Sequence, residues 1–157
     1  MKRELEIYID GACSGNPGEA AIGVLVQENS KRIKEISKTI GQGTNNIAEY
    51  SAFIAALKEA ALLKADKIRI YTDSELLFKQ STGQYKIKNE NLKLLFEEAK
   101  GLAEKFKAVE IKQIPREQNS AADQLASKAL KKRQAKMVAS VFQPIYDTGE
   151  ESPSSRG

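Results

Sequence analysis

The chain has 157 residues, a length that favours one domain with a core of its own. Its net charge is +4, and no apolar run approaches the ~20 residues needed to span a bilayer. The absence of histidine excludes imidazole metal sites and the Ser-His-Asp and Cys-His kinds of catalytic site. A single cysteine, Cys13, excludes an internal disulfide and a thiolate zinc site. Any chemistry must therefore come from carboxylates, hydroxyls, amines or a bound hard cation.

The basic charge lies before residue 143. Residues 1–142 carry 24 basic and 18 acidic side chains, whereas the remainder is acidic and rich in Pro, Ser and Gly. This bias permits nucleic-acid binding, although a solvated lysine-rich surface is the simpler explanation of the charge alone. The chain also starts without the uninterrupted apolar segment of a secretory signal, so we expect a cytoplasmic protein that does not enter membranes.

The first part of the chain predicts three strands and a helix. Alternating or continuous apolar residues predict strands at residues 5–9, 20–27 and 31–40. The glycine-rich segment 11–18 between the first two is expected to form a loop. From residue 46 to residue 65 apolar side chains recur every three or four positions, which indicates a helix.

The same patterns predict a strand at 67–72, a helix at 74–80, a helix from Asn89 to about 106, a strand at 109–114 and a helix from 119 or 120 to about 133. The element order is β-β-β-α-β-α-α-β-α, which predicts an α/β fold with a mixed five-stranded sheet flanked by helices. We expect residues 1–133 to form the folded domain and 134–157 a C-terminal extension, partly disordered from about 143.

Two aspartates are predicted to stand where strands end. Asp10 follows the first strand and Asp73 follows residues 67–72. Ligands of α/β sheets gather at the carboxyl ends of strands, so both residues are candidates for a site. The alternative is that each is an ordinary turn-forming aspartate.

Two further acids have a stronger structural alternative. Glu49 lies three residues after Asn46, and Asp123 lies three residues after Ser120, which is the spacing of a helix capping box. A capping role would leave their polar surroundings unexplained, namely residues 44–46 and 116–119.

The four acids together suggest a cation site. Four clustered carboxylates would repel one another unless divalent ions lay among their oxygens. Magnesium prefers hard oxygen ligands, and a pair of ions suits in-line displacement at phosphorus.

Four segments, in order, resemble the motifs of type 1 ribonucleases H. They are Tyr8-Ile-Asp10-Gly11-Ala-Cys-Ser-Gly-Asn16-Pro-Gly18, Thr44-Asn45-Asn46-Ile-Ala-Glu49-Tyr50, Ile-Tyr-Thr-Asp73-Ser74 and Asn119-Ser-Ala-Ala-Asp123-Gln-Leu-Ala. The agreement in order and spacing covers residues 4–133 and is highly specific. The resemblance implies a ribonuclease H-like fold.

The resemblance also implies an activity and a metal. Asp10, Glu49, Asp73 and Asp123 would bind two Mg2+ ions, with Mn2+ as a substitute, and cleave the RNA strand of an RNA–DNA hybrid. The products would carry 5′-phosphate and 3′-hydroxyl ends. A monomer that binds the hybrid is expected.

The resemblance further implies a set of substrate-binding residues. Asn16, Asn45 and Asn46 would lie in the minor groove of the hybrid, and Thr44 near a DNA phosphate. Backbone groups of Ala12 and Cys13 would meet the RNA strand, where the 2′-hydroxyl distinguishes it from DNA. Gly11 and Ser74 belong to the same set. For Asn16 and Thr44 the alternative is local turn hydrogen bonding.

The chain departs from the family pattern at two places. Many bacterial members have a histidine in the loop before the fourth acid, where this chain has Arg116, a catalytic candidate that holds a phosphate but cannot shuttle a proton. An ion pair with Glu117 or plain solvation is the alternative for Arg116. The second departure is the missing tryptophan-containing basic handle; here only Lys79 and residues 83–89 follow the third acid.

Two rival functions remain from the sequence alone. One is a non-catalytic module that binds hybrids or double-stranded RNA on the same fold, against which the complete acid set argues. The other is an exonuclease or integrase on a related fold, against which the asparagine-rich motifs argue.

Overall fold

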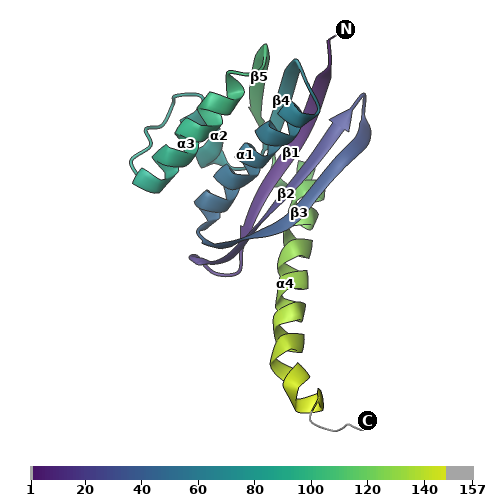
Figure 1. The fold of residues 1–157 in the computed structure, drawn as a ribbon. Helices are drawn as coiled ribbons and strands as arrows, with labels where there is room; N and C mark the ends of the chain where they lie inside the picture. Colours follow the sequence, from purple (N-terminus) through teal and green to yellow (C-terminus); the bar gives the residue numbers. More distant parts are fainter. Residues whose placement is uncertain (1, 148–157) are drawn as a thin grey trace.

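A computed structural model describes residues 2–147 of the protein (Figure 1). The strands are β1 (Glu4–Cys13), β2 (Gly18–Glu28), β3 (Lys31–Gly43), β4 (Lys67–Thr72) and β5 (Ala108–Gln113). The helices are α1 (Asn45–Leu62), α2 (Glu75–Ser81), α3 (Glu90–Ala103), the short 3-10 helix η1 (Arg116–Gln118) and α4 (Ser120–Asp147). The predicted order of strands and α-helices is confirmed.

The five strands form one mixed sheet in the order β3-β2-β1-β4-β5. β1 is central, antiparallel to β2 and parallel to β4, while β3 and β5 are the outermost strands. Since the parallel strands β1 and β4 are neighbours, the residues at their carboxyl ends meet at one place. This arrangement brings the first and third motifs together.

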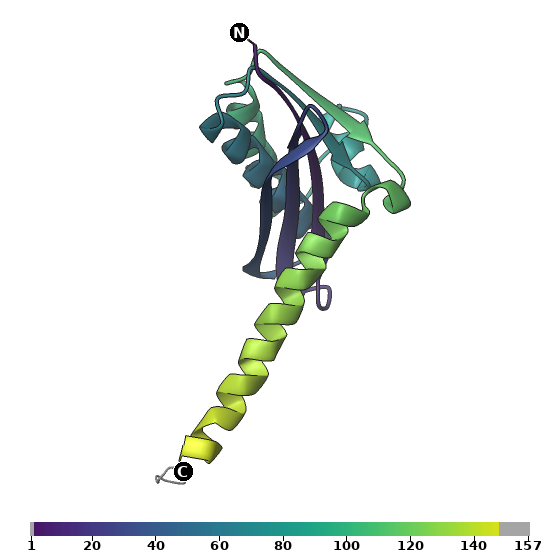
Figure 2. The same cartoon turned by 90° about the vertical axis from the view of Figure 1, so that its right-hand side faces the viewer.

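Helices cover the sheet on both faces. The core lies under α1, where the apolar side chains of β1 (Leu5, Ile7 and Ile9) pack against Tyr50 and Leu57. α3 packs on α1, and α4 packs across β1, β2 and β3. Beyond the sheet α4 continues as a long helix that projects away from the domain (Figure 2).

Two boundaries differ from the sequence prediction. Gly11, Ala12 and Cys13 belong to β1 and not to a loop, because β1 stays paired with β2 as far as Cys13 and Ala20. α4 continues past residue 133 to Asp147, so the predicted helix end is wrong. Good helix formers such as Ala, Lys, Arg and Gln fill residues 128–136 and carry the helix onward. Residues 148–157 lie outside the described residues.

Within residues 2–147, no helix is long and apolar enough to cross a membrane.

Candidate active site

Two glycines let helices approach the sheet closely from opposite faces. A Cβ at Gly11 would lie 2.5 Å from the backbone of Ala48 and Glu49 in α1. A Cβ at Gly23 would lie 2.0 Å from the carbonyl oxygen of Ala122 in α4. Gly23 is the register partner of Asp10, so the α4 backbone passes over β2 beside Asp10. These contacts place acids of α1 and α4 next to the centre of β1.

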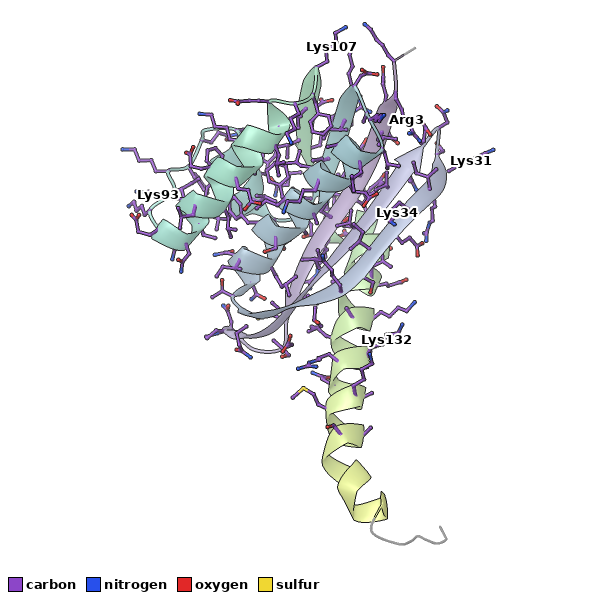
Figure 3. All side chains as sticks on the ribbon, viewed as in Figure 1. Arg3, Lys31, Lys34, Lys93, Lys107 and Lys132 are labelled. Carbon is purple, nitrogen blue, oxygen red and sulfur yellow. The ribbon has the colours of Figure 1, made fainter. Side chains whose placement is uncertain are left out.

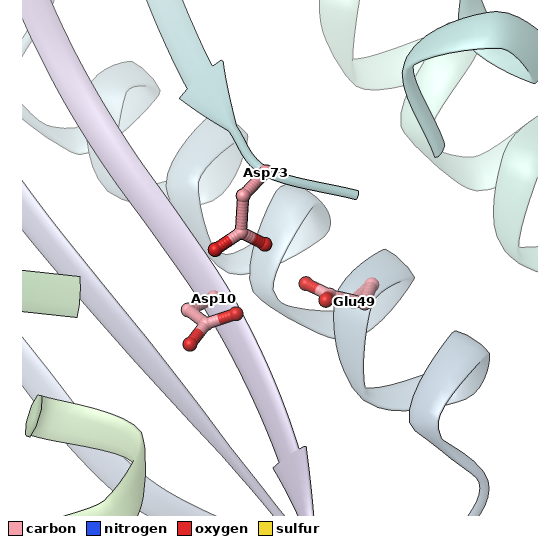
Figure 4. A group of neighbouring side chains, drawn as sticks. All are labelled: Asp10, Glu49 and Asp73. Atoms are coloured by element: carbon pink, nitrogen blue, oxygen red, sulfur yellow. The ribbon is translucent and has the colours of Figure 1, made fainter. Parts of the chain in front are cut away.

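Three carboxylates converge at this point. Single carboxylate oxygens of Asp10, Glu49 and Asp73 all lie within 4.8 Å of one another, a spacing that suits a shared cation (Figure 4). The backbone N–H of Gly11 donates to Glu49 Oε1 over 3.0 Å and so fixes the glutamate over β1. The N-cap of α1 is Thr44, not Asn46, and the capping-box explanation of Glu49 is therefore wrong.

The fourth acid arrives from α4. Asp123 lines the same hollow as the other three acids, although it lies outside the group of three whose oxygens come within 4.8 Å of one another. The first bond of α4 joins the N–H of Asp123 to the carbonyl of Asn119, which puts Asn119 at the N-cap. The predicted capping box between Ser120 and Asp123 is therefore also wrong.

The packed carboxylates disfavour one another's ionisation. Burial and the charges of Asp73 and Asp123 raise the pKa of Asp10 to about 8. Burial and the charges of Asp10 and Asp73 raise the pKa of Glu49 well above its usual range, while Arg116 acts in the opposite direction. A cation among these oxygens would stabilise the ionised carboxylates and so oppose both shifts. The donor set, all carboxylate oxygen, fits a hard divalent cation.

Asn119 is a buried polar residue at this site that we did not expect from the sequence. It is 1% exposed, and its Nδ2 donates to the carbonyl of Ile9 over 2.8 Å, with Asp73 Oδ2 at 3.4 Å. The pairing of β1 with β4 ends at Tyr8 and Tyr71. The carbonyl of Ile9, the next residue of β1, therefore accepts its hydrogen bond from Asn119 and not from β4. Its position in the fourth motif was visible, but its partners come from distant segments.

We expect Asn119→Ala to lower both stability and activity. It leaves the buried Ile9 carbonyl without its donor, which costs about 1–3 kcal/mol of unfolding free energy. The substitution also removes the amide that lies 3.4 Å from Asp73 Oδ2 and helps to hold this carboxylate in place. Turnover should therefore fall more than the loss of stability alone explains. Urea unfolding and single-turnover cleavage measure the two effects, with Gln118→Ala, an exposed neighbour, as control. Unchanged stability would contradict the structural role of Asn119.

The remaining predicted site residues divide between two adjoining hollows. Besides the acids, the first hollow is lined by the predicted residues Gly11, Ala12, Cys13, Asn45, Ser74 and Arg116. The second is lined by Asn16, Thr44 and Asn46 together with Asn89 and Asn91 of the α3 start. Asn89 and Asn91 were missed, because nothing in the sequence indicates that the start of α3 lies beside the start of α1.

Several of these residues also have local structural contacts. Thr44 Oγ1 accepts from the N–H of Ile47, and Ser74 Oγ accepts from Leu77, so both cap helices. Asn16 Oδ1 accepts from the N–H of Asn45 over 3.0 Å and ties the β1–β2 connection to α1. The local hydrogen bonding that was the alternative is thus present for Thr44, whereas the bond of Asn16 is a tertiary contact with a residue 29 positions away.

Arg116 lies in η1, exposed at the rim of the acidic hollow. In the described part of the chain it forms no ion pair with Glu117. The guanidinium is therefore available to an anion that enters beside the acids.

Comparison with known proteins agrees with this geometry. A family model described as "Reverse transcriptase-like" matches residues 8–129. The crystal structure of RNase H1 from Halobacterium salinarum superimposes with a TM-score of 0.80 at 39% identity, covering 82% of this chain and 98% of that one. The chain belongs to the type 1 ribonuclease H family.

Other members of the ribonuclease H family are similarly close. The LC11-RNase H1 structure, solved in complex with an RNA/DNA hybrid, gives a TM-score of 0.78 at 35% identity, covering 83% of this chain and 99% of that one. In sequence, ribonuclease HI of H. salinarum is 44% identical over 124 residues, which are 78% of this chain and 62% of that protein. The bifunctional protein Rv2228c of Mycobacterium tuberculosis is 36% identical over 153 residues, 96% of this chain. The chain spans 42% of the length of that mycobacterial protein.

Proposed function

We propose that the protein is an endonuclease that hydrolyses the RNA strand of RNA–DNA hybrids. The observation that carries this proposal is the meeting of four acids from four separate elements with Arg116 around one hollow. The solved hybrid complex of a ribonuclease H1 with the same fold supports the choice of substrate. A non-catalytic binding module would have no use for carboxylates whose charges oppose one another.

Two Mg2+ ions, with Mn2+ as a substitute, are the proposed cofactors. Asp10, Glu49, Asp73 and Asp123 would hold them, and the oxygens of the first three already lie at a spacing that suits one shared cation. When bound, such ions supply an activated water and neutralise charge on the leaving 3′ oxygen, giving 5′-phosphate and 3′-hydroxyl ends.

The chain's own residues would position the hybrid. Asn16, Asn45 and Asn46 would enter its minor groove, Thr44 would meet a DNA phosphate, and backbone groups of Gly11, Ala12 and Cys13 would meet the RNA strand beside Ser74. Asn89 and Asn91 line the same groove as Asn16 and Asn46 and extend this polar surface. An amide-lined groove recognises a duplex with a wide, exposed minor groove and 2′-hydroxyls.

We propose residues 1–133 as the catalytic domain and 134–157 as a C-terminal extension. The family match over residues 8–129 supports the boundary. We further propose that the protein acts in the cytoplasm as a monomer.

The test is cleavage of labelled hybrid, duplex RNA and duplex DNA with and without Mg2+. We expect cleavage of the hybrid alone, internal to the RNA strand, and only with the metal. Degradation of the products by a 5′-phosphate-dependent exonuclease checks the ends, and sedimentation checks the monomer. Hybrid binding without cleavage in Mg2+ and in Mn2+ would favour the binding module instead.

Arg116→Ala should slow cleavage about ten- to a hundredfold. The loss corresponds to about 1.5–3 kcal/mol for a charge-assisted hydrogen bond to the scissile or product phosphate. Arg116→Lys should restore part of it, because the planar fork is gone but the charge remains. Metal affinity should not weaken, since Arg116 is a positive neighbour of the acids.

Single-turnover rates and Mg2+ titrations measure these effects, with exposed Lys107→Ala as control. A guanidinium does not titrate near neutrality, so no inflection between pH 6 and 8 should depend on Arg116. A variant as fast as wild type would make Arg116 a surface residue.

A further inference from the structure

The exposed part of α4 carries a concentrated positive charge. Every residue from 131 to 140, here called the α4 arm, is exposed. The arm contains Lys131, Lys132, Arg133 and Lys136, and no acidic residue occurs between Asp123 and Asp147. Within the described residues none of these four cations forms an ion pair. The arm thus has no anionic partner of its own in this part of the chain.

The arrangement of the charges is unfavourable for an isolated helix. Lys128, Lys132 and Lys136 are spaced four residues apart and therefore lie in one row along α4. Like charges at this spacing repel one another and destabilise a helix. A polyanion alongside the helix would turn this repulsion into attraction.

The arm is continuous with the acidic hollow. Asp123, Ser127 and Leu130 of α4 line the hollow, and the arm begins at the next residue. From Asp123 to Lys136 the helix advances about 20 Å at 1.5 Å per residue. This length corresponds to about six base pairs at 3.4 Å each. A duplex held at the acids and long enough on this side would come within reach of the arm.

We propose that the α4 arm binds the phosphate backbone of the hybrid several base pairs from the cleaved bond. The proposal rests on the proposed function and adds a second contact area to it. Lysine and arginine contacts to phosphate strengthen binding without reading sequence. The exposed apolar side chains of Met137 and Val138 offer the competing use, an association between copies of the chain.

The test compares two variants of equal charge. The arm variant changes Lys131, Lys132, Arg133 and Lys136 to Gln. The control variant changes Lys31, Lys34, Lys105 and Lys107 to Gln. All four are exposed, and Lys31 and Lys107 lie toward the opposite end of the domain from Lys132 (Figure 3). Both variants have the full chain and Asp10→Asn, so that bound hybrid stays intact. Fluorescence anisotropy in Mg2+ gives the Kd for a hybrid of about 24 base pairs and one of about 8 over a range of salt concentrations.

For the long hybrid we expect the arm variant to bind at least about tenfold more weakly than the parent. The slope of log K against log salt concentration should become shallower by about 0.9 for each phosphate contact that is removed. The control variant should lose much less, and the loss in the arm variant should be smaller for the short hybrid, which extends at most to the first residues of the arm. Equal losses of affinity in both variants, or no loss in the arm variant, would overturn the proposal. Cleavage of the hybrid by the native chain would still support the proposed function. The parent protein could instead sediment in a concentration-dependent way that the arm variant does not show, with an unchanged affinity for the hybrid. That result would assign the arm to self-association.

Discussion

Asp10→Asn should reduce cleavage by about a thousandfold or more, equivalent to about 4 kcal/mol of lost transition-state stabilisation. Asp10 is 6% exposed, and its carboxylate lies within 4.8 Å of those of Glu49 and Asp73, so no other carboxylate can take its position. An amide keeps the shape of the side chain but brings no charge to a cation. Single-turnover cleavage in Mg2+ measures the loss of activity. The control is Glu97→Gln at an exposed residue of α3. Near-normal turnover by the variant would contradict the proposed metal site.

The same substitution should stabilise the metal-free protein in a pH-dependent way. The pKa of Asp10 rises from 3.8 to about 8 on folding, so between these values the folded protein binds more protons than the unfolded chain. The contribution of Asp10 to the unfolding free energy therefore falls as pH rises from about 4 to 8 and is constant above. Asn lacks this penalty, so the Tm advantage of the variant should grow across this range in EDTA. Mg2+ should reduce the Tm advantage of the variant, because Mg2+ binds the folded wild-type protein through its complete set of carboxylates and stabilises it.

Gly23→Ala should destabilise the fold by about 3 kcal/mol or more, at the upper end of overpacking effects. The added methyl group would meet the carbonyl oxygen of Ala122 at 2.0 Å and the backbone nitrogen of Ala126 at 2.7 Å, and backbone cannot rotate away. For a chain of this size the change corresponds to a fall in Tm of roughly 6–12 °C. Because α4 must move, Asp123 should also leave its place beside Asp10, and activity should fall further than the population of unfolded chains explains.

The matched control is the same change at Gly101, an exposed position of α3. There a Cβ meets nothing within 4 Å, so Ala should stabilise the helix by about 0.5–1 kcal/mol. Thermal unfolding of both variants gives the comparison. Equal Tm values for the two alanine variants would mean that α4 is not tightly packed on β2.

The sequence was sufficient to select the four acids that line one hollow, because each lies in a short local motif. Asp10, Glu49, Asp73 and Asp123 do meet at one place, and the mixed sheet and the order of its elements are as expected. What the motifs could not show is how closely the helices approach. Gly23 lies in an unremarkable apolar strand, and its role appears only because α4 crosses it.

Local patterns were misleading where a tertiary partner decided the outcome. The glycine-rich segment after Asp10 resembles a loop, yet its first three residues stay in β1 because β2 pairs with them. The spacing of Glu49 from Asn46 resembles a capping box, yet the N–H of Gly11 holds the glutamate over the sheet. The sequence likewise gave no sign of where Asn89 and Asn91 would lie, since only the packing of α3 on α1 brings them to the groove.

The outermost strand β3 bears on how the protein avoids aggregation. With 13 residues it offers a long free edge, a surface on which strands of other copies could assemble into extended sheets. Lys31, Arg32, Lys34 and Lys38 put positive charge along this edge, and all four are exposed. Two irregularities in its pairing with β2, at Ala20/Ala21 and Val26/Gln27, interrupt the flat register that edge-to-edge assembly needs. β3, which places no residue in the acidic hollow, thus has a charged and irregular edge that opposes the pairing of one copy of the chain with another.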